Sequence, residues 1–216
     1  MIYDGISPFW KLSGQKVLRI MNDVQNTPDS ELWHCTFSGY QATTHCNHAY
    51  RAFDRDIELL FDKLLGGLRG VLPDLRFLAN HFDEPRVLIP PALGDQFSLT
   101  DMSKRHVWDT LTKFCSGGNS SSARIRQKVE TFGLPFVTDP MSAMDLCRYP
   151  EYYNMHGLLL SPTSFRPIEG RVPVLSTGTP STMGDILYPS PAYVESEFQY
   201  AGAHDVNWNK KRNNLY

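Results

Sequence analysis

The sequence predicts an α/β fold, and three patterns lead to that prediction. Residues 49–65 have the periodicity of an amphipathic helix. They are followed at 75–80 by a short segment whose alternating residues and flanking turn residues indicate a strand. A second short strand is predicted at 172–176 and a further helix at 13–25. Helices alternating with short strands are the repeating unit of an α/β sheet.

The first helix is predicted to begin after Ser13, whose hydroxyl can cap it, and to end at 26–28, where a proline follows. Its apolar positions recur at three- and four-residue spacing: Val17, Leu18, Ile20, Met21 and Val24. The second helix, 49–65, carries an apolar face opposite a charged one. Two glycines at 66–67 are predicted to close it.

The rest of the chain gives weaker patterns. Thr100 or Asp101 is predicted to start a helix that carries Val107, Leu111 and Phe114, and one or two helical turns are predicted at 125–132. A flexible surface loop is predicted near 116–123, where glycine and serine dominate. The last third is rich in proline and aromatic residues, so we expect short irregular pieces packed on the sheet.

Composition excludes several classes of protein. The chain has 216 residues, of which 41% are hydrophobic, and 21 basic against 23 acidic side chains give a net charge of −2. Twelve Phe, ten Tyr and four Trp supply a core, so a disordered chain is not expected. A nearly neutral chain has no general field for nucleic acid, and no nucleic-acid partner is predicted. No apolar run of about 18 residues and no secretory leader is visible, so the sequence taken alone predicts a cytosolic chain without a membrane segment.

The four cysteines, Cys35, Cys46, Cys115 and Cys147, form no closely spaced pair. The sequence leaves open whether Cys35 and Cys46 form a disulfide, which would matter only in an oxidising compartment. Three histidines lie near the first two cysteines, but the spacing of this group fits no familiar ligand pattern, so no metal site is predicted. The group consists of His34, Cys35, His45, Cys46 and His48.

Asp83 and Glu84 are the strongest candidates for chemistry, because they directly follow the strand predicted at 75–80. In open α/β sheets, ligands bind outside the carboxyl ends of the strands. Two adjacent carboxylates tend to point in different directions, so one of them is expected to be the working group. The alternative is a solvated turn in which Asp83 or Glu84 pairs with Arg86.

Three aromatic residues near the end, Phe198, Tyr200 and Trp208, could stack on a sugar or a base, although packing is the default interpretation. No motif for a serine or cysteine nucleophile is present. Composition and spacing alone therefore predict an α/β domain and no particular reaction.

Several segments, in this order and at these separations, resemble the fungal capsule-associated-protein type glycosyltransferases, family 90. This family also holds the protein O-glucosyltransferases and O-xylosyltransferases of animals. The segments are 5–10, 72–74 leading to 80–87, 160–167, 172–176, 184–191 and 208–216. Each motif is weak alone, but six in register cover nearly the whole chain.

The resemblance implies an inverting transferase that moves xylose or glucose from a UDP-sugar to a hydroxyl of a glycan or protein acceptor, without a metal or other cofactor. It implies a GT-B architecture of two Rossmann-like halves. Asp83 matches the position of the family's catalytic base. Ser176, Asp185 and Tyr188 fall in a segment that borders the sugar-transfer cleft, and they are carried over as substrate contacts. Gly184 departs from the family, in which Ser or His is frequent.

The resemblance also implies that residues 1–216 are a single incomplete catalytic domain, the acceptor-side half. In the family, a second half with most of the UDP-binding residues follows the segment matched by 208–216, so the chain is expected to be inactive alone. Family members typically reside in the lumen of the secretory pathway, often on a membrane anchor, and the sequence leaves the compartment of this chain undetermined. The alternative is a non-catalytic carbohydrate-binding or interaction module that kept the acceptor groove. A hydrolase would need a second carboxylate opposite Asp83, and none is predicted there.

Overall fold

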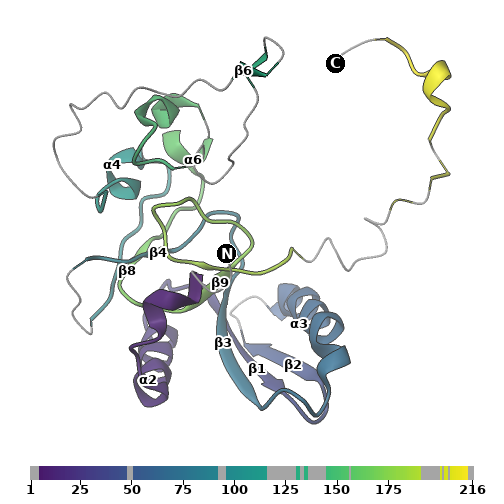
Figure 1. Cartoon of the computed structure of the whole chain (residues 1–216). Helices are drawn as coiled ribbons and strands as arrows, with labels where there is room; N and C mark the ends of the chain where they lie inside the picture. The colour runs from purple at the N-terminus through teal and green to yellow at the C-terminus, as the bar shows by residue number, and fades with distance from the viewer. Residues whose placement is uncertain are drawn as a thin grey trace.

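The computed structural model describes residues 5–47, 51–91, 96–115, 130–131, 134–135, 145–155, 157–190, 200, 202–203 and 205–213. Its central feature is a five-stranded sheet with the order β10-β9-β3-β1-β2 (Figure 1). The strands are β1 (Leu32–Ser38), β2 (Thr43–Asn47), β3 (Leu75–Asn80), β9 (Val174–Ser176) and β10 (Ile186–Leu187). Strand β1 pairs antiparallel with β2 and β3, whereas β9 pairs parallel with β3 and β10. The chain is therefore a mixed α/β fold.

Helices α2 (Gly14–Gln25) and α3 (Arg51–Leu65) flank the central sheet (Figure 1). The Ser13 hydroxyl caps α2 by accepting a hydrogen bond from the Lys16 amide at 3.3 Å. The apolar stripe of α2 packs with Leu32, Leu78 and Val174 in one core cluster. The stripe of α3 packs with Trp33, Cys35 and Ala79 in another. Because residues alternate between the two faces of a strand, β1 and β3 contribute to both clusters.

A second layer of short elements covers the end of the sheet where β3 finishes. A three-stranded sheet has the order β4-β8-β5, formed by β4 (Val87–Leu88), β5 (Ser98–Leu99) and β8 (Ile168–Glu169). Next to it lie α4 (Trp108–Leu111), η3 (Pro150–Asn154) and α6 (Gly157–Leu160). A third core cluster, which includes Leu88, Val107, Leu111, Leu159 and Phe165, joins these elements. Figure 1 shows α4 and α6 together, far from α3.

The remaining elements are short: η1 (Ser7–Phe9), η2 (Gly66–Leu68), β6 (Glu130–Thr131), β7 (Leu134–Pro135) and η6 (Trp208–Lys210). No helix of the described part of the chain is long and apolar enough to cross a membrane.

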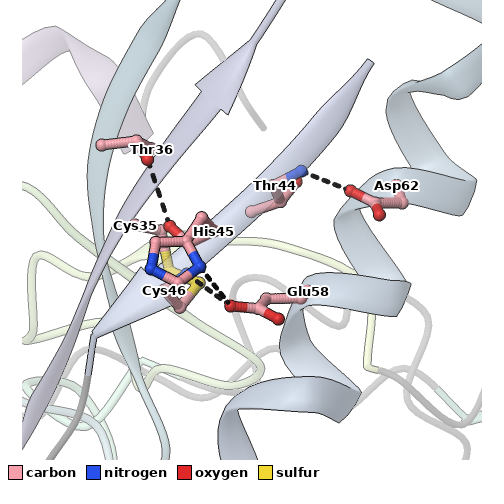
Figure 2. The surroundings of a disulfide bond; sticks show 7 residues. All are labelled: Cys35, Thr36, Thr44, His45, Cys46, Glu58 and Asp62. Carbon is pink, nitrogen blue, oxygen red and sulfur yellow. Dashed lines mark hydrogen bonds and ion pairs between the residues drawn. A yellow bond between two sulfur atoms is a disulfide. The ribbon is translucent and has the colours of Figure 1, made fainter. Parts of the chain in front are cut away.

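The hairpin of β1 and β2 is fastened in two ways (Figure 2). Cys35 and Cys46 lie directly opposite each other in the register and form a disulfide bond. On the outer edge of β2, the Thr44 amide donates to Asp62 Oδ1 at 2.6 Å and the Cys46 amide donates to Glu58 Oε1 at 2.7 Å. Both carboxylates come from α3, so this helix occupies two donors that an edge strand would otherwise offer to another chain.

The structure confirms the helices predicted at 13–25 and 49–65, the latter within its described residues, and the strand at 75–80. The strand predicted at 172–176 is confirmed in its last three residues. Glycines 66 and 67 end α3 through the single turn η2. Strands β1 and β2 were not predicted from the sequence.

The prediction of a helix from Thr100 or Asp101 is wrong, because α4 begins only at Trp108. Asp101 Oδ1 instead accepts from the Ser103 amide at 2.8 Å, and Lys104 has a left-handed backbone (φ 59°) that no α-helix accommodates. At 130–131, within the helical turns predicted for 125–132, the structure has strand β6. The loop predicted near 116–123 and residues 125–129 lie outside the described residues.

Candidate functional site

The turn after β3 is organised by the side chain of Asn80, the buried last residue of that strand. Its amide nitrogen donates to the carbonyl oxygens of Phe82 (3.1 Å) and Glu84 (2.7 Å), and its Oδ1 accepts from the Phe82 amide at 3.1 Å. Such local bonds from an Asn side chain to the following backbone are typical of tight turns. Residues 81–84 are thus held in one conformation, and Asp83 lies exposed within it.

Asp83 and Glu84 line a pocket of about 290 Å³. The rest of the wall consists of Gly157 and Leu158 of α6 and of residues 161–163, which include the hydroxyls of Ser161 and Thr163. Glu84 Oε2 accepts a hydrogen bond from the Ser164 hydroxyl at 3.1 Å. The two adjacent carboxylates therefore have different surroundings: Glu84 is bonded to the neighbouring segment, whereas Asp83 is exposed.

Arg86, two residues further on, is fully buried and does not form the ion pair considered for Asp83 or Glu84. Its Nε donates to the Arg166 carbonyl oxygen at 2.8 Å and its Nη2 to the Ser30 carbonyl oxygen at 2.7 Å. The guanidinium carbon also lies 5.2 Å from the centre of the Phe82 ring. Burial lowers the pKa of Arg86 to about 10. Arg86 thus joins three segments distant in sequence.

Asp185 and Ser176, two of the predicted substrate contacts, lie together behind this turn. Asp185 Oδ1 accepts from the Ser176 hydroxyl at 2.6 Å and from the Arg86 amide at 2.8 Å. Its Oδ2 accepts from the Val87 amide at 2.8 Å. Burial raises the pKa of Asp185 to about 6, while the three donors and the Arg86 charge act in the opposite direction. Asp185 therefore holds the start of β4 against the end of β9, and its role as a substrate contact stays a prediction.

Tyr188, the third predicted contact, belongs to the core between the sheet and α3. Its ring lies 5.5 Å from that of Phe61, centre to centre, and its amide donates to the Ser176 carbonyl oxygen at 3.1 Å. Burial raises the pKa of the Tyr188 hydroxyl to about 12. The structure therefore brings Ser176 and Asp185 to the segment that follows Asp83, whereas the Tyr188 ring packs on α3. Gly184 has Ile89 against it, where a Cβ atom would come within 2.2 Å of the Ile89 Cδ1 atom.

The four cysteines of the chain are bonded to one another in pairs. Cys35 and Cys46 are joined to each other, and Cys115 is joined to Cys147. Among the described residues, no group of three or more His, Cys, Asp and Glu side chains could hold a metal ion. His48 and Phe198 lie outside the described residues.

Tyr200 and Trp208 do not pack into a core, which was the default interpretation. Both are about 80% exposed, at 79% and 80%. The Tyr200 hydroxyl donates to Asp205 at 2.7 Å, and the Lys211 ammonium lies 5.3 Å from the centre of the Trp208 ring.

Sequence reasoning did not single out Asn80 and Arg86 as residues that organise the site. For Asn80 a signal existed, since Asn at the end of a strand is a strong turn former. For Arg86 there was none, because its partners lie 56 and 80 residues away.

No protein-family model, curated protein or solved structure matches the chain.

Proposed function

We propose that this chain is the acceptor-side part of an inverting glycosyltransferase that moves xylose or glucose from a UDP-sugar to an acceptor hydroxyl. The observation that carries the proposal is the exposed Asp83 carboxylate in a pocket at the carboxyl end of β3, on a turn fixed by Asn80. This is where α/β folds bind ligands. The six motifs that resemble family 90 support the same reading, and with it a GT-B architecture.

In the proposed reaction, Asp83 takes the proton of the acceptor hydroxyl as the acceptor oxygen attacks the anomeric carbon of the donor. The bond from that carbon to the UDP oxygen breaks on the opposite face, and UDP leaves with the electron pair. One displacement inverts the configuration. A carboxylate can perform this proton transfer without a metal. The proposal assigns the UDP group to a second α/β half, as in the family that the chain resembles.

The disulfide bonds support a location in the lumen of the secretory pathway. All four cysteines are paired, as Cys35–Cys46 and Cys115–Cys147. Disulfides persist in oxidising compartments and are rare in the cytosol. We therefore propose this location for the chain, whose compartment the sequence left undetermined.

The test is Asp83→Asn in a protein extended through the donor-binding half, with transfer and UDP affinity measured separately. We expect transfer to fall about 100-fold or more, because a general base contributes roughly 10²–10⁴ in rate. UDP affinity should stay unchanged, because Asp83 acts on the acceptor. Asp23→Asn is the control, since it makes the same substitution at an exposed position on α2 that does not line the pocket, and it should retain full transfer.

Two outcomes would count against the proposal. Full turnover in Asp83→Asn would mean that another group is the base. An extended protein that binds saccharides but never turns over a UDP-sugar would favour the alternative, a non-catalytic carbohydrate-binding module.

A further inference from the structure

Three aromatic side chains, His106, Trp108 and Tyr153, form a cluster on elements that share a core with α6. The rings of His106 and Tyr153 lie 4.4 Å apart, centre to centre, with an angle of 37° between their planes. The Trp108 ring meets Tyr153 edge-on at 5.9 Å. Tyr153 is 41% exposed and His106 is exposed as well, although Trp108 packs against the third core cluster. The cluster thus presents aromatic surface to solvent on a buried support.

The segments that carry this cluster also build the pocket wall. Tyr152, next to Tyr153 in η3, and Trp108 pack against the same core cluster as Leu158 of α6, and Leu158 lines the pocket. The Lys104 amide, two residues before His106, donates to the carbonyl oxygen of the wall residue Pro162 at 2.7 Å. The aromatic surface and the pocket are therefore built on the same core cluster and connected by this backbone bond.

The chemistry of this combined surface fits a neutral sugar. Carboxylates and hydroxyls, supplied by Asp83, Glu84, Ser161 and Thr163, can hydrogen-bond sugar hydroxyls. Aromatic faces are apolar and carry partial negative charge, which suits the C–H groups of a pyranose ring. Two carboxylates in the pocket disfavour an anionic ligand.

We propose that Tyr153 and His106 form a stacking subsite for a neutral saccharide acceptor, whose reacting hydroxyl reaches Asp83. This inference rests on the proposed function and names its acceptor as a glycan. A folded protein acceptor would make a broad contact and would not depend on one aromatic platform.

The experiment uses the full-length protein and three variants: Tyr153→Ala, Tyr153→Phe and His106→Ala. Tyr40→Ala is the matched control, because Tyr40 is 85% exposed on the turn between β1 and β2. Three readouts are taken: hydrolysis of the UDP-sugar by water, transfer to mannotriose, xylotriose and cellotriose, and saturation-transfer NMR of the same trisaccharides. Hydrolysis requires no acceptor and reports on the proposed function alone.

We expect at least one trisaccharide to bind and to accept sugar. Tyr153→Ala and His106→Ala should raise its KM about three- to tenfold, the range for loss of an aromatic contact, with donor hydrolysis unchanged. Tyr153→Phe keeps the ring and should behave as the wild type, as should Tyr40→Ala. If Tyr153→Ala unfolds, the exposed His106 still provides the test.

The inference is overturned if no trisaccharide binds to the wild-type protein, or if both alanine variants keep the wild-type KM while hydrolysis is intact. Efficient transfer only to a folded protein domain would overturn it as well. A wild-type protein that binds a trisaccharide through Tyr153 but hydrolyses no UDP-sugar would support the subsite and refute the proposed reaction, so the two failures are distinguishable.

Discussion

Replacing Asp185 with Asn tests how the segment behind Asp83 is held. The wild-type carboxylate accepts three hydrogen bonds, two at Oδ1 and one at Oδ2. An Asn side chain retains two of them if its oxygen takes the place of Oδ1. Its NH2 group then faces the Val87 amide, donor to donor, in a buried site.

The magnitude follows from that one unpaired group. A buried N–H without an acceptor costs about 1–3 kcal/mol, so Asp185→Asn should lower the free energy of unfolding by about 2 kcal/mol at pH 7.5. The variant stays folded if the protein has the usual stability of about 5–15 kcal/mol.

The difference in the free energy of unfolding between the wild-type protein and Asp185→Asn should grow as the pH falls. The pKa of Asp185 is about 6 in the folded protein against 3.8 for an ordinary Asp, so the folded state binds the proton more tightly. A carboxyl proton can be donated to the Ser176 hydroxyl oxygen while both carboxyl oxygens still face the backbone amides. Stability from this group is therefore present at low pH and is lost as the pH rises through 6. Between pH 7.5 and pH 5 the wild-type protein should gain about 1.4 kcal/mol that the Asn variant does not.

The measurement is urea unfolding of both proteins at several values between pH 5 and 7.5, with Asp23→Asn, an exposed position on α2, as control. Taking the difference between the two proteins removes the contributions of other titrating groups. A difference in stability that shrinks towards pH 5 would refute the reasoning, because it would mean that the three donors and Arg86 outweigh burial and hold the pKa of Asp185 below its ordinary value.

Asn80→Asp should remove both donors to the turn and lower the free energy of unfolding by about 2 kcal/mol. Under the proposed function, transfer should fall while UDP affinity stays unchanged. Transfer at the wild-type rate would show that the turn does not depend on these bonds. Replacing Cys35 and Cys46 together by Ser should cost about 3 kcal/mol for a separation of 11 residues, measured by urea unfolding with and without reductant. Stability unaffected by reductant would contradict this. Glu58→Ala with Asp62→Ala should free the β2 edge and promote self-association, measured by light scattering; a monomeric double variant of wild-type stability would argue that the α3 carboxylates do not protect the edge.

The parts of the fold that sequence predicted are those in which local pattern and tertiary burial agree. Helix α2 has an apolar stripe and a Ser cap, and both are used in the structure. Strand β1 could have been predicted, because Trp33, Cys35 and Phe37 alternate with polar residues. All three are buried in the structure. Strand β2 had none. Its inward residues are Thr44 and Cys46, and it exists through pairing with β1 and cover from α3.

The candidate site also contains residues that could be located from the sequence and residues that could not. Asp83 could be located from sequence because a strand end followed by turn residues is a local pattern, and the structure puts it in a pocket there. The residues that hold it could not be located, because their partners are far along the chain: Asp185 contacts the Arg86 amide across 99 positions.

The turn that carries Asp83 is therefore fixed at both ends by buried side chains, with Asn80 on one side and Asp185 on the other. A general base must be held within a fraction of an ångström of its substrate, so both side chains serve the proposed reaction even if neither touches a ligand. Loss of activity on changing Asp185 would consequently not identify it as a substrate contact. Comparing activity with stability across pH separates the two roles. Changing a buried structural residue lowers activity and stability together, whereas changing a ligand contact lowers activity alone.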